Sequence, residues 1–182
     1  NDMPLVNRAL KLEKIALENL EKTYDPVRKV YTQAVGAEHL DASTLKMITM
    51  NYLNPNSDKA KDHLKALEQL LKTEQGLFYR YVHQDDFGKP EATFLVCAFW
   101  YVDALRLTGQ REKARAVFER MLARANHVGL FSEGIHPEHN YMTGNFPQAY
   151  THVAIINSGM MLSRNWGEVG GRHFTDFELD AR

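Results

Sequence analysis

Apolar positions recur with helical spacing in six stretches of the chain. In 4–23, 58–73 and 111–125 the apolar residues fall mainly on one face, with Lys, Arg and Glu opposite, which is typical of half-exposed helices. In 41–52, 91–108 and 146–163 they spread around more of the helix, which predicts burial. The two kinds alternate along the chain. The predicted inward faces of the first and third stretches are Leu5, Leu12, Ile15, Ala16 and Leu20, and Leu64, Leu67, Leu70 and Leu71.

Capping residues support several of these boundaries. Asp41 or Ser43 can cap the second helix, and Ser57 precedes the third in a turn-forming segment. Gly109 lies where a C-terminal cap is needed after the fourth helix. Pro147 suits the first turn of the sixth.

The connectors also alternate in length. Long connectors precede the three buried helices, and short ones follow them. Antiparallel helical hairpins with this alternation predict an all-α fold in which the long loops meet at one rim. Segments 31–33, 78–81 and 131–133 are therefore expected to be neighbours. We expect function at this rim, where helix N-termini also favour anions.

Composition narrows the class of protein without naming it. The 182 residues carry a net charge of −1, which gives no electrostatic reason to expect nucleic acid or an anionic membrane as partner. No apolar run approaches the roughly 20 residues of a membrane span. The one cysteine, Cys97, excludes an internal disulfide and fits a reducing compartment, so we expect a cytoplasmic protein. The predicted organisation is one domain over 1–164 and a polar, Gly-containing extension over 165–182.

The connector 129–150 carries the densest chemistry in the chain. Its glycines and prolines predict a loop, and its aromatic residues argue against disorder. His136, Glu138 and His139 invite a metal interpretation, but their spacing does not match a closed zinc site. We therefore expect neither a metal nor a cofactor. His152, on the following helix, is expected to be a hydrogen-bonded structural histidine.

Several blocks of the sequence stand out together: Thr32-Gln33-Ala34-Val35-Gly36 with Leu40-Asp41-Ala42-Ser43, Leu77-Phe78-Tyr79-Arg80-Tyr81, the run 91–105, Gly129-Leu130-Phe131-Ser132-Glu133, and Gly144-Asn145-Phe146-Pro147-Gln148-Ala149-Tyr150-Thr151-His152-Val153. They resemble glycoside hydrolase family 15, the glucoamylase family, with its bacterial glucoamylase-like and trehalase-like branch as the closer likeness. They occur in the family's order and span about 31–162. The resemblance implies an (α/α) barrel of six helical hairpins, of which this chain holds about half.

The resemblance also implies roles for individual residues. The family hydrolyses α-glucosidic bonds with inversion, which needs a general acid and a general base roughly 6.5–9.5 Å apart. The Ser-Glu pair implies that Glu133 is the base. Arg80 is implied as a ligand of sugar hydroxyls, and Tyr81, Gln148 and Tyr150 are further candidates for substrate binding. The implied substrate is an α-glucan, a malto-oligosaccharide or a trehalose-type sugar.

Two departures from the family pattern matter. Gly134 stands where the family often has an acidic or amide residue after the base. The family's general acid lies in a Trp-Glu block upstream of everything matched here, and no such block is found near the N-terminus. The chain is therefore expected to supply the general-base half of a site and to be inactive alone.

Other interpretations stay open at this point. Tyr150 and Trp100 can form a sugar-stacking platform, although Trp100 is expected in the core. The chain can instead be a non-catalytic helical scaffold, or a half-barrel that binds a protein partner or associates with itself through its edge helices. Helices over 91–125 look somewhat like a tetratricopeptide repeat, but no second copy appears about 34 residues away.

Overall fold

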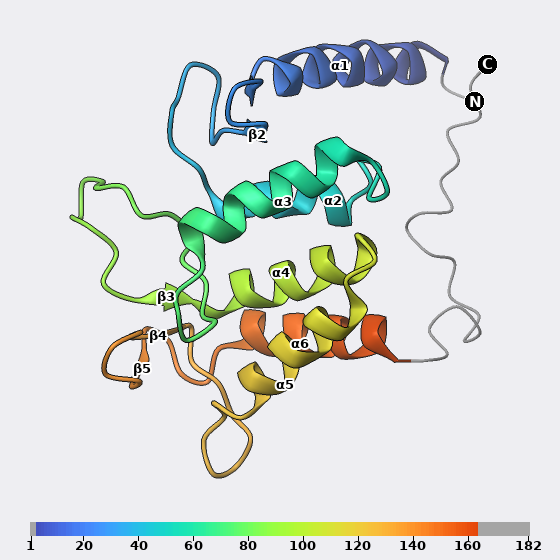
Figure 1. Ribbon diagram of the computed structural model, residues 1–182. Coiled ribbons are helices and arrows are strands. Elements are labelled where there is room, and N and C mark those ends of the chain that lie inside the picture. Colours follow the sequence, from blue (N-terminus) through green and yellow to red (C-terminus); the bar gives the residue numbers. More distant parts are fainter. Residues whose placement is uncertain (1–2, 164–182) are drawn as a thin grey trace.

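The computed structural model describes residues 3–163, and the extension predicted over 165–182 lies outside them. The fold is mainly helical, as expected (Figure 1). Its elements in chain order are α1 (Met3–Glu21), β1 (Tyr24–Asp25), β2 (Val30–Tyr31), the 3₁₀ helix η1 (Ala42–Leu45), α2 (Lys46–Thr49), α3 (Asp58–Leu71), β3 (Thr93–Phe94), α4 (Leu95–Leu107), α5 (Arg111–Leu122), β4 (Gly134–Ile135), β5 (Met142–Thr143) and α6 (Ala149–Leu162).

Helix α4 is the centre of the core. It packs against α5, α6, α2 and η1, and its side chains from Leu95 to Phe99 and from Tyr101 to Leu105 are buried, as predicted. Trp100 is an exception to the prediction because it is only half-buried, with the Lys46 ammonium 5.5 Å from its ring centroid. The core continues into α3 through Leu64, Leu67 and Leu71, whereas Leu70, predicted to face inward, is 44% exposed.

Three of the local signals mark real helix ends, whereas Pro147, expected in the first turn of the sixth helix, lies before Gln148, the N-cap of α6. Asp41 caps η1 by accepting a hydrogen bond from the Ser43 N–H, and the Ser57 hydroxyl accepts one from Ala60 at the start of α3. Gly109 has a φ of +84° after α4, and the N–H of Gln110 donates to the carbonyl of Leu105. This is the left-handed helix termination that glycine favours.

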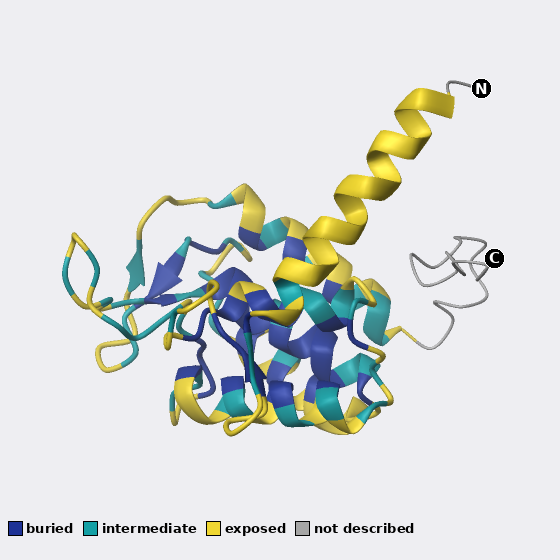
Figure 2. Cartoon of the chain, turned by 90° about the horizontal axis from the view of Figure 1, so that it is seen from above, coloured by how far each residue is buried: buried dark blue, intermediate teal, exposed yellow. Residues whose placement is uncertain are grey.

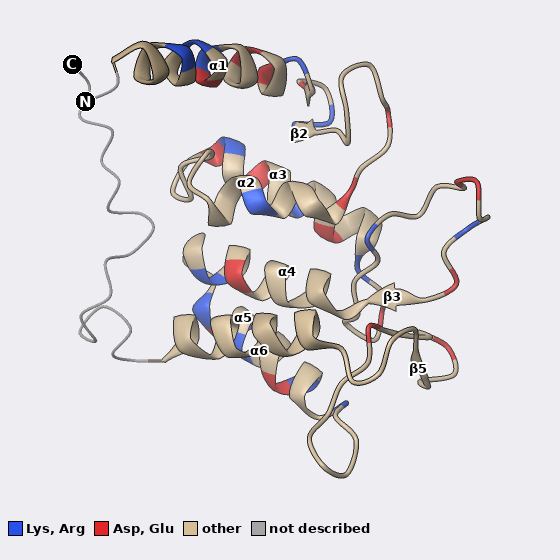
Figure 3. Ribbon diagram, turned by 180° about the vertical axis from the view of Figure 1, so that it is seen from behind, with Lys and Arg blue, Asp and Glu red and all other residues tan. Residues whose placement is uncertain are grey.

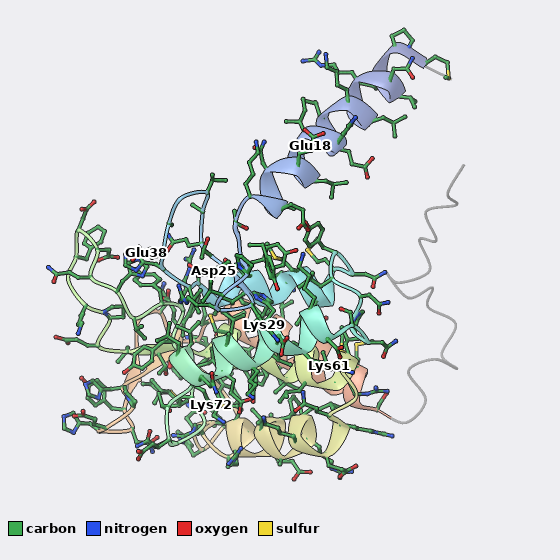
Figure 4. The ribbon with its side chains drawn as sticks, turned by 45° about the horizontal axis from the view of Figure 1, so that its top comes forward. Glu18, Asp25, Lys29, Glu38, Lys61 and Lys72 are labelled. Atoms are coloured by element: carbon green, nitrogen blue, oxygen red, sulfur yellow. The ribbon has the colours of Figure 1, made fainter. Side chains whose placement is uncertain are left out.

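Helix α1 departs from the prediction. No residue of α1 is buried, and the helix projects from the body (Figure 2). The apolar face predicted to pack inward is exposed except at Leu20, which is half-buried, because no other element in the described part of the chain covers it. In Figure 4, Glu18 lies on the projecting part, whereas Asp25 and Lys29 of the β1–β2 hairpin lie near its base.

Helix α6 departs in a similar way. Only Thr151, Ala154 and Ser158 are buried, although burial of most of the helix was predicted. One side packs on α4 and α5. The other exposes the apolar side chains of Tyr150, Val153, Ile156 and Met160. The sequence pattern shows that this helix is apolar. Burial of its exposed side would need a further packed element, which residues 3–163 do not supply.

Two small antiparallel sheets complete the fold. Strands β1 and β2 pair Tyr24 with Tyr31. Strands β3, β4 and β5 form a three-stranded sheet at the N-terminal end of α4, where Gly134 pairs with both Phe94 and Thr143. The connector 129–150, predicted as loop throughout, therefore contributes two of its strands.

Candidate active site

Main-chain hydrogen bonds join three distant segments at the start of α4. The Leu95 N–H donates to the Glu133 carbonyl (3.0 Å), the Phe94 N–H donates to Phe78 (3.0 Å), and the Ala42 N–H donates to Arg80 (2.7 Å). Segments 78–81 and 131–133, expected to be neighbours, are thus bonded to the consecutive residues Phe94 and Leu95. The segment bonded to Arg80 is Asp41–Ala42, and not 31–33 as expected. Tyr31 instead packs on Tyr24, Tyr52 and His63.

Glu133 is half-buried beside this junction, and one of its two carboxylate oxygens is fixed. Oε2 accepts a hydrogen bond from the main-chain N–H of Asn145 (3.1 Å) and another from its side-chain Nδ2 (2.8 Å). The Glu133 N–H donates in turn to the Asn145 carbonyl (2.9 Å). Within residues 3–163, Oε1 accepts no hydrogen bond. The carboxylate is therefore oriented while one oxygen stays available.

Gly134 has a packing reason that explains its departure from the family pattern. A Cβ at this position would lie 2.4 Å from the Thr93 carbonyl oxygen and 2.7 Å from Thr143 Oγ1. Real Cβ atoms do not approach other atoms this closely. The middle strand of the small sheet therefore excludes a side chain directly after Glu133.

Arg80 forms an ion pair with the buried carboxylate of Asp41. Its Nε lies 3.2 Å from Asp41 Oδ2, and the Arg80 side chain is 53% exposed while that of Asp41 is 5% exposed. Asp41 Oδ1 is already engaged by the Ser43 N–H (2.7 Å). The buried carboxylate thus fixes the stem of the guanidinium, and the remaining donors reach solvent, where they can bind hydroxyl groups.

Tyr81 begins a row of three neighbouring rings that starts beside Arg80. Its ring centroid is 4.6 Å from that of His83, which stacks on His39 at 4.1 Å. The Tyr81 hydroxyl donates to Asp85, and this bond holds the pKa of Tyr81 above its usual value and that of Asp85 below it. The ring face of Tyr81 is therefore better suited than its hydroxyl to contact a ligand.

Tyr150 and Gln148 lie where the loop passes into α6. Tyr150 is 51% exposed and meets Trp100 edge to face, with ring centroids 6.1 Å apart. The two rings predicted as a possible stacking platform are thus adjacent and accessible. The Gln148 N–H donates to the Phe131 carbonyl (2.9 Å), which ties the start of α6 to the loop that bears Glu133.

His152 is a structural histidine, as predicted. Its Nε2 accepts from the Phe131 N–H (3.3 Å), so the proton resides on Nδ1, which donates to the Gln148 carbonyl (2.7 Å). His136 and His139 stack on each other and on Tyr141. Among the described residues no cluster of three or more His, Cys, Asp or Glu could hold a metal ion.

The distribution of charged residues, the hydropathy of the helices and a surface hollow complete the description of the surface. Acidic and basic residues are interspersed over the body, with acidic residues on the loops around β3 and β5 (Figure 3). None of the described helices combines the length and hydropathy that crossing a bilayer requires. A surface hollow of about 480 Å³ lies between the base of α1 and α2, with Gln33 and Met50 in its lining, so it is separate from Glu133.

Asn145 and Asp41 are the residues that sequence reasoning missed. Both belong to blocks that carried the family resemblance, and that membership was the available signal. Neither the role of Asn145 toward Glu133 nor that of Asp41 toward Arg80 follows from spacing, since the partners are 12 and 39 residues apart.

Solved structures with a similar fold are glycosidases. A wild-type glycosidase matches with a TM-score of 0.73 at 14% identity, over 91% of this chain and 46% of that chain. A glycosidase variant in complex with glucose matches with a TM-score of 0.74 at 13% identity, over 88% of this chain and 46% of that chain. At such low identity the likeness establishes the fold. The chain spans about half the length of these glycosidases.

Sequence relatives identify the family. The trehalase of Mycobacterium tuberculosis is 40% identical over 149 residues, which make up 80% of this chain and 22% of that protein. The trehalase of Thermoplasma volcanium is 35% identical over 144 residues, 79% of this chain and 23% of that protein. Residues 7–160 match the family described as Glycosyl hydrolases family 15. Because this match covers most of the chain, including the Glu133 loop and Arg80, the chain belongs to glycosyl hydrolase family 15.

Proposed function

We propose that this chain forms the general-base side of the active site of an inverting glycoside hydrolase, with Glu133 as the base. The observation that carries the proposal is the state of the Glu133 carboxylate, in which Oε2 is fixed by Asn145 and Oε1 accepts no hydrogen bond from the part of the chain that the structure describes. A general base needs both an oriented carboxylate and an oxygen free to accept a proton.

The reaction uses one water molecule. Oε1 of Glu133 takes a proton from this water as its oxygen attacks the anomeric carbon, and the bond from that carbon to the glycosidic oxygen breaks. The leaving oxygen receives a proton from the general acid, and the new hydroxyl has inverted configuration. Arg80 binds hydroxyl groups of the sugar, while Tyr81, Gln148 and Tyr150 line its binding site.

The general acid comes from another part of the catalytic domain. Asp85 and Asp103 are carboxylates of this chain with shifted pKa values, and neither suits the role of general acid. The pKa of Asp85 is lowered by the Tyr81 hydroxyl, whereas an acid catalyst needs a raised pKa. Burial raises the pKa of Asp103 to about 6, but Asp103 is bonded to Ser158 between α4 and α6. It also lies eight residues beyond Leu95, about 12 Å along the helix from the junction at Glu133.

The complete catalytic domain is proposed to be a six-hairpin (α/α) barrel, of which this chain is about half. The 46% coverage of the glycosidase chains supports this division. The trehalase relatives favour trehalose or a similar α-glucoside as substrate, and malto-oligosaccharides are the alternative. The glucose bound by one structural neighbour agrees with a glucosyl unit at the cleaved bond.

Chemical rescue tests the assignment of Glu133. In the complete catalytic domain, Glu133→Ala is expected to abolish hydrolysis of trehalose, and azide is expected to restore turnover by attacking the anomeric carbon in place of activated water. The product is then the β-glucosyl azide, which NMR identifies. Rescue that yields the α-azide, or near-normal hydrolysis by the variant without azide, would contradict the proposal.

Self-association is a second candidate property, favoured by the exposed apolar side chains of α1 and α6. These are Leu5, Val6, Leu10, Leu12, Ile15, Leu17, Val153, Ile156 and Met160. Exposed apolar patches of this kind favour association. Light scattering of the 182-residue chain is expected to give a mass above 20.9 kDa that rises with concentration. A monomer at high concentration would exclude this property.

A further inference from the structure

Glu133 is bound to one short segment more closely than to any other. Asn145 makes three hydrogen bonds with it, two to Oε2 and one between main chains. The two donors come from different parts of the same residue, so they approach Oε2 from two directions. Two N–H donors complement an ionised carboxylate, which can only accept, and ionised is the form that a general base needs.

Gly144 provides the room for this arrangement. A Cβ at Gly144 would lie 2.8 Å from Glu133 Oε2 and 2.9 Å from Glu133 Cβ. Its φ of +71° is also in the left-handed region that glycine favours. The main chain at 144 thus lies directly against the carboxylate, where a side chain would displace it.

The Gly144–Asn145 pair is itself held on both sides. Thr143 in β5 pairs with Gly134, the residue after Glu133. After the pair, Gln148 donates from its main chain to Phe131. Both ends of the segment are therefore bonded to residues within two positions of Glu133, which keeps Asn145 and Glu133 in register.

We propose that Gly144 and Asn145 are positioning residues for the general base. Asn145 fixes Oε2 so that Oε1 is the oxygen that accepts the proton of water, and Gly144 leaves space for the carboxylate in that orientation. The inference rests on the proposed function of Glu133. The inference goes beyond that function by assigning the orientation of the Glu133 carboxylate to Asn145, twelve positions away.

Substitutions of Asn145 test the donor role. In the complete catalytic domain, Asn145→Ala is expected to lower kcat about 10- to 100-fold, the effect of losing one hydrogen bond to a charged group, with KM changed less than about 2-fold. Asn145→Asp keeps the shape but replaces the donor by a second negative charge, so it is expected to lower kcat further. Equal activity of the Asp variant and the wild type would mean that Asn145 only fills space.

Two glycine variants provide a matched pair for the space requirement. Gly129 has a φ of +81°, and a Cβ there would meet no atom within 4 Å. Gly129→Ala and Gly144→Ala therefore introduce similar backbone strain, but only the second crowds Glu133. Gly144→Ala is expected to lower kcat at least about 10-fold more than Gly129→Ala, at similar melting temperature. Equal kcat values would overturn the proposal for Gly144.

A double-mutant cycle separates this inference from the proposed function. In the Glu133→Ala background, Asn145→Ala is expected to cause no further change in the azide-supported rate, because its partner is gone. If Glu133→Ala alone leaves turnover near normal, the proposed function fails. If Glu133→Ala is inactive but Asn145→Ala leaves kcat unchanged, or slows the azide reaction as much as hydrolysis, only the positioning role fails.

Discussion

Two glutamates of this chain are held by hydrogen bonds in opposite ways. Glu21, at the end of α1, has both oxygens engaged: Oε1 accepts from the hydroxyls of Tyr52 (2.6 Å) and Tyr31 (2.7 Å), and Oε2 accepts from Lys59 Nζ (3.0 Å). Glu133 has one oxygen fixed by Asn145, and the other accepts no hydrogen bond from any described residue. A fully engaged carboxylate connects elements, whereas a half-engaged one is oriented and still able to react.

The surroundings of Glu21 fit a structural role. The Tyr52 hydroxyl, followed by Tyr31 and Lys59, lowers the pKa of Glu21 to about 2. The Lys59 ammonium also lies over the rings of Tyr24 and Tyr31, at 4.2 and 4.8 Å from their centroids. We call Glu21, Tyr31, Tyr52 and Lys59 the Glu21 anchor, because they connect α1 to the body.

The same substitution at both positions gives the largest expected contrast. In the complete catalytic domain, Glu133→Gln is expected to lower kcat about 10²- to 10⁴-fold, the range for loss of a general base, with the melting temperature unchanged. Glu21→Gln is the matched control and is expected to leave kcat unchanged. Steady-state kinetics on trehalose measure both. Comparable kcat losses for the two variants would remove the distinction.

Low pH is expected to destabilise the fold near the Glu21 anchor by protonating His63, which accepts a hydrogen bond from Tyr31. Burial lowers the pKa of His63 from 6.5 to about 4, against the hydrogen bond to the Thr44 carbonyl, which raises it. Nδ1 accepts a hydrogen bond from the Tyr31 N–H, so protonation of this nitrogen would break that bond. A histidine with a depressed pKa stabilises the fold fully above pH 6.5, and this contribution is lost as the pH falls toward 4. The stability of the wild type relative to His63→Gln, measured by urea unfolding, is therefore expected to fall by about 3 kcal/mol at most between pH 6.5 and pH 4. Asp103, whose raised pKa acts in the opposite direction over this range, contributes to both proteins and cancels in the difference. A difference that does not change with pH would exclude a contribution from His63.

A substitution of Asp41 tests whether its ion pair with Arg80 contributes to binding of the sugar. Asp41→Asn removes the charge that holds Arg80 while leaving an oxygen for the Ser43 N–H, so kcat/KM is expected to fall about 10-fold, mainly through KM. Asp62→Asn is a suitable control, because Asp62 pairs with Lys29 at a similar distance of 3.1 Å on α3. If the two variants have the same KM, the Asp41–Arg80 pair does not orient the sugar ligand.

The smallest expected effect is that of Glu21→Ala. It removes the acceptor of two tyrosine hydroxyls and is expected to cost about 1 kcal/mol of unfolding free energy. Since the pKa of Glu21 is lowered from 4.5 to about 2, its contribution is present above about pH 4.5 and is lost as the pH falls toward 2. Unfolding at pH 7 and pH 3 measures the difference, which should be smaller at pH 3. A constant difference would show that the charge of Glu21 does not matter.

The parts of the fold that were predictable depend on local chemistry. Asp41 and Gly109 act on their own neighbours along the chain, so their caps follow from sequence. The strands around Gly134 do not, because each ladder has two residues and exists only where β3 and β5 meet it. The exposed faces of α1 and α6 were mispredicted for a related reason, since an apolar pattern shows what a helix can bury but not whether a neighbour is present.

The residues of the candidate site also divide into those that were predictable from the sequence and those that were not. Glu133 and Arg80 were found through motifs, whereas their partners Asn145 and Asp41 became visible only in three dimensions. A motif records residue types along the chain, but a hydrogen bond to a carboxylate depends on where a second segment passes.

The position of Gly134 in the small sheet has a consequence for how new specificity can be engineered. Its main chain is fixed between β3 and β5, and Thr143 pairs with it immediately before the Gly144–Asn145 segment. The hairpin tip over 136–141 lies beyond this fixed register. The tip can therefore be exchanged or lengthened as a graft site for sugar-recognition loops, while the carboxylate of Glu133 keeps its orientation.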